Sequence, residues 1–184
     1  MRLRQPRVQP LQDGEGTPEQ QELLERAGRD RPPLNIFRTL IHHPKLWRAW
    51  GRFGGHVLND STLPPREREI LILRIGWLCQ SEYEFGQHTR MGLDVGLSEA
   101  EIRRITEGPD AEGWDPFEAT LLRAANELHA DAFLSDATWA ALGARYSTEQ
   151  LMDAVFTVGQ YTLVSMALNT LGVQREEGTA GFPA

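Results

Sequence analysis

The chain has 184 residues, of which 40% are hydrophobic and 24% charged, so it has the composition of a globular domain and not of a disordered chain or a minimal stapled peptide. Its formal net charge of −7 leaves no basic surface for following a phosphate backbone, and we expect no nucleic-acid partner.

Two residue types occur only once. Lys45 is the only lysine, which leaves few candidates for Schiff-base chemistry or for anchoring a cofactor. Cys79 is the only cysteine, which excludes an internal disulfide and is consistent with a reducing compartment. Residues 1–16 carry no apolar stretch of the kind found in secretory signals, so we predict a cytoplasmic location.

Residues 1–16 also lack helical periodicity, and we predict a flexible N-terminal arm. Thr17, Pro18 and Gln20 have the spacing of a capping box with proline in the first turn, which predicts a helix that ends near Gly28. Arg31, Pro32 and Pro33 predict a break after that helix.

Helical spacing or capping residues recur along the rest of the chain. The predicted segments are a short apolar turn over 34–41 and helices over about 44–58, 66–80, 81–96, 98–106, 115–133, 135–146 and 147–173. No segment alternates apolar and polar residues over strand length, so the predicted fold class is all-α. We predict one domain over 17–175 and a flexible tail over 176–184.

The stretch 154–174 carries no charge and is long enough to span a membrane. It also contains polar side chains that hydrocarbon would leave costly to satisfy: Thr157, Gln160, Tyr161, Ser165, Asn169 and Thr170. We therefore expect a buried core or subunit-interface helix and no membrane partner.

The polar residues of SEYEFGQH form the main candidate site. If this segment is helical, Ser81, Glu84 and His88 lie on one face, with Glu84 and His88 one turn apart. Glu69 stands on the preceding helix, just before an uninterrupted apolar run. A glutamate beside a histidine can act as a general acid/base pair, although a solvated surface pair has the same spacing.

The run PREREILILRIGWLCQSEYEFGQHTRMGLDVGLSEAEI resembles the core motif of the carboxymuconolactone decarboxylase family, an all-α fold that includes the alkylhydroperoxidase-like proteins. The family pattern is Arg-Glu before an apolar run, a short polar motif, a histidine, and Gly-Leu-Ser-x-x-Glu-Ile. The resemblance covers about residues 34–175 and is strongest over 64–103. It implies a site near the histidine, between helices, in a homo-oligomer that is a trimer or hexamer.

In the peroxidase branch of this family, two cysteines precede the histidine by seven and four residues, and a glutamate precedes it by about 19. His88 and Glu69 match the histidine and the glutamate, but Ser81 and Glu84 occupy the two cysteine positions. Because dithiol chemistry needs two thiols within reach, we do not expect this chain to be a dithiol peroxidase. Cys79 stands two residues before the first cysteine position, where we expect a buried apolar residue and not a nucleophile.

In the decarboxylase branch, the position four residues before the histidine is commonly a glutamate, and these enzymes use no cofactor. The resemblance therefore implies a cofactor-independent decarboxylase, isomerase or dehydratase that acts on a small unsaturated acid, lactone or β-keto compound. His88 and Glu84 would carry the proton, and Glu69 would orient or charge His88. Tyr83 or Ser81 would donate a hydrogen bond to the enolate oxygen of the substrate.

Arg74 stands alone in the apolar run, where a buried guanidinium needs a partner. That partner is Glu69, Glu84 or a substrate carboxylate, or else a structural ion pair.

Other polar and aromatic residues have weaker patterns. His42, His43 and His56 do not have the spacing of a metal site, and the first two precede Pro44 as a helix-start feature. Three further residues could reach the candidate site around His88 or could be core residues with their hydrogen bonds satisfied: His129, Tyr161 and Asn169. Three aromatic residues have the spacing of core residues or, alternatively, of a pocket lining: Trp47, Trp50 and Phe53.

Two other functions remain open. One is a peroxide-handling oxidoreductase that uses Cys79 with an external thiol. The other is a non-catalytic oligomeric binding protein in which the polar face of 81–88 is a subunit contact.

Overall fold

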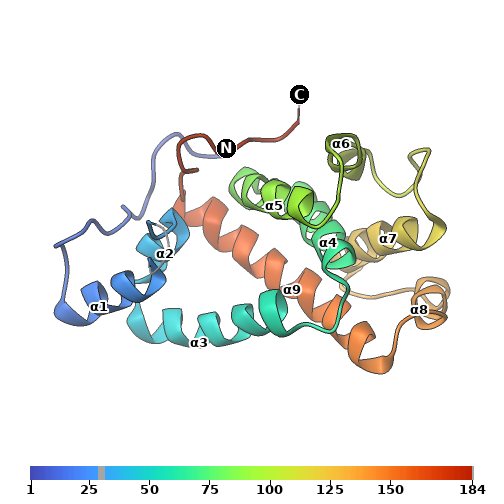
Figure 1. The fold of residues 1–184 in the computed structure, drawn as a ribbon, viewed down its shortest axis with the longest axis horizontal. Coiled ribbons are helices and arrows are strands. Elements are labelled where there is room, and N and C mark those ends of the chain that lie inside the picture. Colours follow the sequence, from blue (N-terminus) through green and yellow to red (C-terminus); the bar gives the residue numbers. More distant parts are fainter. Residues whose placement is uncertain (29–31, 184) are drawn as a thin grey trace.

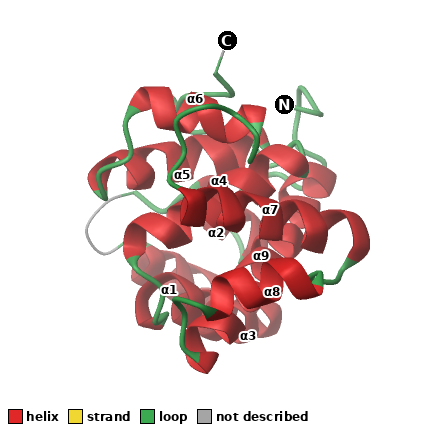
Figure 2. Ribbon diagram, turned by 90° about the vertical axis from the view of Figure 1, so that its right-hand side faces the viewer, coloured by secondary structure: helices red, strands yellow, loops and turns green. Residues whose placement is uncertain are grey.

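The computed structural model describes residues 1–28 and 32–183, which form α-helices, one π-helical turn and no strand (Figures 1 and 2). The elements are α1 (Pro18–Ala27), α2 (Asn35–Leu40), α3 (Pro44–Gly55), η1 (His56–Asp60), α4 (Pro65–Leu78), α5 (Glu82–Asp94), α6 (Glu99–Glu107), α7 (Pro116–Asp131), α8 (Asp136–Gly143) and α9 (Thr148–Leu171). The all-α prediction is confirmed. Of the break predicted at Arg31–Pro33, Arg31 lies outside the described residues.

Most helices begin where the sequence predicts. Capping boxes start α1, α6 and α9, with Thr17, Ser98 and Ser147 as the N-cap residues. Ser81 occupies the N-cap position of α5, but its hydroxyl makes no capping hydrogen bond. His43 caps α3, since its Nδ1 accepts a hydrogen bond from the Leu46 amide, so this histidine is a helix-start residue as expected.

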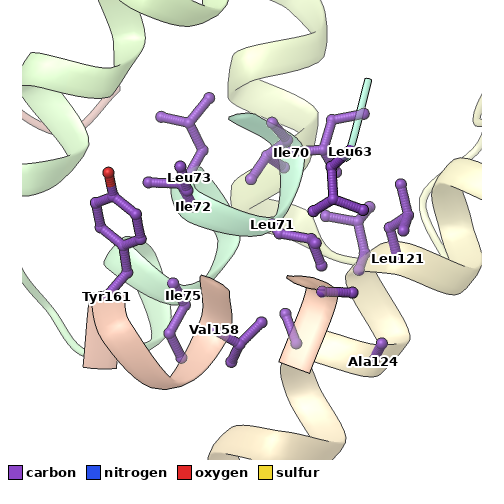
Figure 3. Close-up of a cluster of buried hydrophobic side chains, with 14 of the residues drawn as sticks. Leu63, Ile70, Leu71, Ile72, Leu73, Ile75, Leu121, Ala124, Val158 and Tyr161 are labelled. Atoms are coloured by element: carbon purple, nitrogen blue, oxygen red, sulfur yellow. The ribbon is translucent and has the colours of Figure 1, made fainter. Parts of the chain in front are cut away.

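Helix α4 is the centre of the fold. It packs against α5, α7 and α9, and the side chains of residues 70–73 and of Ile75 are fully buried. Figure 3 shows these side chains between Tyr161 and Val158 of α9 and Leu121 and Ala124 of α7. The sequence of α4 is apolar on nearly every side because other helices cover nearly every side of it.

Helix α9 crosses the middle of the molecule diagonally, between α3 and the α4–α5 pair (Figure 1). It is the one helix of the described residues that is long and apolar enough to cross a membrane, and half of its apolar window is buried inside the fold. On its other side, four apolar side chains are more than half exposed: Met152, Phe156, Leu163 and Met166. It is therefore a core helix with one uncovered apolar face.

The two terminal segments pack onto the domain, which differs from the expected flexible arm and tail. Leu11 is buried against α1 and α2, and the amides of Arg7 and Val8 donate to the carbonyl of Leu171. The Phe182 ring lies 4.8 Å from that of Trp77 and 5.3 Å from that of Phe85, as measured between centroids. Apolar side chains spaced along both segments provide this packing, although they lack helical periodicity.

We expect Gly86→Ala to release the C-terminal tail, because a Cβ at this position of α5 would overlap the carbonyl oxygen of Ala180. Alanine otherwise favours a helix over glycine by about 1 kcal/mol, so α5 itself remains intact. Limited proteolysis should cut the variant after residue 178 faster than the wild type. Gly159→Ala is the matched control, because a Cβ there meets no atom within 4 Å; equal cleavage of both variants would contradict the prediction.

Candidate functional site

His88 lies between two carboxylates in the interior. Its Nδ1 is 2.6 Å from Oε2 of Glu69, which α4 supplies, and its Nε2 is 2.9 Å from Oε1 of Glu84, one turn earlier on α5. Glu69 has no exposed surface, and Glu84 and His88 are 5% and 4% exposed. The three residues predicted as catalytic are therefore together, as a buried cluster and not as a solvated surface pair.

The carboxylates determine the charge of the imidazole. Burial alone would lower the pKa of His88, but the adjacent Glu69 and Glu84 carboxylates outweigh this effect and raise the pKa to about 10. His88 is therefore an imidazolium at neutral pH. Both of its nitrogens carry protons, and each proton faces a carboxylate oxygen.

Arg68 adds a second positive charge to this cluster. Its Nε lies 3.6 Å from Oε1 of Glu69, and both atoms are buried with no hydrogen-bond partner among the described residues. Two carboxylates thus face two cations, which lowers the cost of burying all four groups. Arg68 was not among the predicted site residues, although it directly precedes Glu69 in the sequence.

A cavity of about 670 Å³ adjoins the cluster, and Glu84 and His88 line it whereas Glu69 does not. Residues of α1, α2, α3, η1, α5 and α9 form the walls. Trp47, Trp50 and Phe37 supply aromatic surface, so Trp47 and Trp50 line the cavity as well as packing against the apolar clusters of the core. Phe53 lies outside the lining, with its ring 6.0 Å from that of Phe156.

Tyr161 also lines the cavity, from α9, and its ring meets the His88 ring edge to face with centroids 4.8 Å apart. Burial, and then the negative charges of Glu84 and Glu69, raise the pKa of Tyr161 well above its usual value. Its phenol therefore keeps its proton and can act as a hydrogen-bond donor.

Neither Tyr83 nor Ser81, the two predicted hydrogen-bond donors to an enolate oxygen, has a hydroxyl free in the cavity. Tyr83 lines the cavity with its body, but its hydroxyl donates to Oε1 of Glu176 at 2.8 Å and accepts from the Ile36 amide at 3.3 Å. Ser81 is fully buried and is not part of the cavity lining.

The prediction that Arg74 pairs with Glu69, Glu84 or a substrate is corrected by its position. Its Nε donates to Oδ1 of Asn126, and its Nη1 donates to the carbonyls of Ile105 and Thr106. Arg74 therefore caps the end of α6, where carbonyls of the last turn lack partners within the helix.

Cys79 lies away from the cavity, at the end of α4. Its Sγ is 3.7 Å from Nδ1 of His129, and Asn169 donates to its backbone carbonyl. Burial raises the pKa of the Cys79 thiol, which reduces the thiolate needed for nucleophilic attack. His129 and Asn169 thus contact Cys79 and do not line the cavity.

The two remaining histidines are also engaged elsewhere. Nε2 of His42 lies 2.9 Å from the carbonyl oxygen of Gln9, and Nε2 of His56 lies 3.1 Å from Oδ1 of Asp153. Each contact ties the histidine to a distant part of the chain.

We expect the stability of the wild type to fall between pH 7 and pH 10 by more than that of His88→Gln. The pKa of His88 is about 10 in the folded protein and about 6.5 in an unfolded chain, so the folded state binds this proton more tightly. The resulting stabilisation is complete below about pH 6.5 and is lost as the pH rises through about 10. Urea unfolding at four pH values measures the difference; parallel curves for the two proteins would refute it.

Comparison with known proteins shows the fold of the chain and a family match for one segment of it. Residues 44–127 match the model of the carboxymuconolactone decarboxylase family, whereas no curated protein matches the chain. A peroxidase-related protein from Silicibacter sp. TM1040 superposes with a TM-score of 0.81 at 13% identity, covering 98% of this chain and 99% of that one. One from Ralstonia eutropha JMP134, described as an alkylhydroperoxidase core, has a TM-score of 0.78 at 18% identity, covering 92% and 93%.

A third similar structure is the debrominase Bmp8 in complex with 2,3,4-tribromopyrrole, with a TM-score of 0.74 at 16% identity over 92% of this chain and 91% of that one. At these identities the structures establish a shared fold. The family match contains Glu69, Glu84 and His88. The segment 44–127 therefore belongs to the carboxymuconolactone decarboxylase family, in a chain that has the alkylhydroperoxidase-like fold and a single cysteine.

Proposed function

We propose that the chain is a cofactor-independent acid/base enzyme, of the decarboxylase, isomerase or dehydratase type, that acts on a small unsaturated acid, lactone or β-keto compound. The observation that carries this proposal is the buried ion-paired cluster of Glu69, His88 and Glu84 beside a cavity of about 670 Å³. Titratable groups with strongly shifted pKa values in a cavity are typical of sites that move protons.

Glu84 and His88 carry the proton in this proposal. The Glu84 carboxylate, which lines the cavity, removes a proton from a carbon next to the substrate carbonyl or returns one to it. The Nε2 proton of His88 lies against this carboxylate and balances its charge before the transfer. In decarboxylation, the electrons of the broken carbon–carbon bond remain on the substrate as an enolate and CO2 leaves. The His88 imidazolium then supplies, through Glu84, the proton that the carbon takes up.

Glu69 acts through His88, because it does not line the cavity. Its hydrogen bond to Nδ1 fixes the orientation of the ring, and its charge keeps the imidazole protonated. Glu69 is a positioning residue in this proposal, and Arg68 contacts its other carboxylate oxygen, Oε1.

The cavity walls supply the remaining requirements. The protonated phenol of Tyr161 can donate to a developing enolate oxygen, in place of the engaged hydroxyl of Tyr83. Arg52 and Arg90 line the cavity on its exposed side, and neither forms an ion pair with a described residue. Their guanidinium groups suit the carboxylate of an acid substrate.

The alternatives receive less support. A peroxide-handling role for Cys79 is disfavoured by the raised pKa of its thiol and by its distance from the cavity lining. A non-catalytic role for the polar face of 81–88 is disfavoured because Glu84 and His88 pair within one chain and adjoin a cavity.

We also propose that the protein is a homo-oligomer, as the family resemblance implies. Its support is the uncovered apolar face of α9, with Phe53 beside Phe156. Exposed apolar patches on a folded domain commonly mark contact surfaces. The cytoplasmic location stays a prediction.

The proton-transfer roles can be tested by proton NMR in deuterated buffer with a panel of unsaturated lactone acids and β-keto acids. His88→Ala and Glu84→Gln should each lower deuterium uptake or CO2 release about 10²–10⁴-fold, the usual contribution of a positioned acid or base. Glu69→Gln should lower the rate less and shift its pH profile, because it acts through His88. His129→Ala is the control and should retain the wild-type rate; full turnover by His88→Ala would disprove the roles.

Cys79→Ser separates the acid/base reaction from peroxide chemistry. We expect this variant to keep the deuterium uptake of the wild type, because the thiol does not line the cavity. The measurement pairs the same NMR assay with peroxide consumption in the presence of dithiothreitol. Thiol-dependent peroxide turnover that disappears in Cys79→Ser would instead favour the oxidoreductase.

A further inference from the structure

Gln160 is a buried polar residue that the acid/base cluster does not use. It lies on α9 and is 3% exposed, yet it lines the cavity together with Glu84 and His88. Its Oε1 is buried and has no hydrogen-bond partner among the described residues. A buried acceptor without a partner costs on the order of 1–3 kcal/mol, so the fold gains nothing from this amide.

The neighbouring helix leaves room for the Gln160 amide. Helix α3 passes it at Gly54, where an added Cβ would lie 3.2 Å from Nε2, closer than ordinary van der Waals contact. The aromatic residues of the same helix, Trp47 and Trp50, form part of the cavity wall. The amide is therefore held between a glycine on α3 and the cavity.

The cavity wall also holds a buried donor without a partner. The indole Nε1 of Trp47 has no hydrogen-bond partner among the described residues. Oε1 of Gln160 and Nε1 of Trp47 are thus an unpaired acceptor and an unpaired donor on residues that line the cavity, and a few such polar groups can orient a ligand beside aromatic surface. A flat ring has the shape to pack on the indoles, and a hydroxyl has the chemistry to donate to the glutamine oxygen.

We propose that Gln160 binds a hydroxyl group of the substrate, and that the substrate is a planar unsaturated or aromatic hydroxy acid whose ring packs against Trp47 and Trp50. The hydroxyl donates its proton to Oε1 of Gln160. This inference rests on the proposed function for its choice of an acid substrate, and it adds the hydroxyl and the planar ring. Glu84 and His88 line the same cavity as Gln160, so a ligand bound at Gln160 shares that cavity with the proposed proton-transfer pair.

The test is binding of matched probes, measured by tryptophan fluorescence and calorimetry. The probes are cinnamate and its 2-, 3- and 4-hydroxy derivatives. We expect at least one hydroxycinnamate to bind the wild type about 10-fold more tightly than cinnamate, because an unpaired buried acceptor discriminates against the ligand that lacks the donor. Gln160→Met should raise the Kd of that hydroxycinnamate about 10-fold and leave the Kd of cinnamate unchanged.

Thr157→Val is the matched control. Thr157 lies one turn earlier on α9 and is fully buried, and its hydroxyl also has no partner, but it does not line the cavity. This variant should keep the wild-type preference for the hydroxycinnamate. The proposal is overturned if no hydroxycinnamate binds, if none is preferred over cinnamate, or if Gln160→Met keeps the preference.

Binding and turnover separate this inference from the proposed function. A preference that depends on Gln160, without deuterium exchange by the wild type on any substrate, would support the hydroxyl site and refute the acid/base enzyme. Deuterium exchange that depends on His88, with no effect of Gln160→Met on binding, would support the acid/base enzyme and refute the hydroxyl site.

Discussion

Glu69, His88 and Glu84 are three ionisable groups that hold one another in the interior of the domain, with a distance of 2.6 Å on one side of the imidazole and 2.9 Å on the other. An isolated charge in such surroundings would cost several kcal/mol, and each of these groups is tolerated because its neighbour carries the opposite sign. The packing of α4 against α5 is what brings Glu69 to His88. The apolar faces of both helices and the contact of Tyr161 with the His88 ring all support this arrangement.

The three groups differ in their access to the cavity. Glu84 and His88 face the cavity, whereas Glu69 stands behind the imidazole and is closed to the cavity. A molecule in the cavity can therefore meet Glu84 and His88, whereas Glu69 stays out of its reach. The cavity belongs as much to α3 and α9 as to α5, so much of its wall lies outside the α4–α5 pair that holds Glu69, Glu84 and His88.

Local signals predicted the helices well. The capping boxes at Thr17, Ser98 and Ser147 act through residues three positions apart, so the sequence contains all that is needed to find them. The pairing of Glu84 with His88 follows in the same way from one helical turn. The pairing of Glu69 with His88 spans 19 residues and rested on the family resemblance, because spacing alone does not reveal how two helices pack.

Contacts between residues far apart in the sequence explain why the predicted roles of Arg74 and Tyr83 were wrong. Arg74 was expected at the site, but it reaches carbonyls at the end of α6, about 30 residues away, and no local pattern encodes that distance. Tyr83 stands at the expected place, but its hydroxyl is taken by Glu176, from a tail that lacks periodicity. Gln160 is visible in the sequence as a polar residue in an uncharged stretch. Its place in a cavity wall follows from the approach of α3 at Gly54, which only the folded structure contains.

The central claim is that His88 is an imidazolium between two buried carboxylates, and the most direct measurement is a long-range proton–nitrogen NMR correlation of its ring. We predict that both ring nitrogens have the shifts of protonated nitrogens at pH 8 and keep them until the pH approaches about 10. Glu69→Gln should make the His88 ring lose its proton at a lower pH, because the adjacent carboxylate is removed. A neutral ring at pH 8, with one unprotonated nitrogen, would contradict the account.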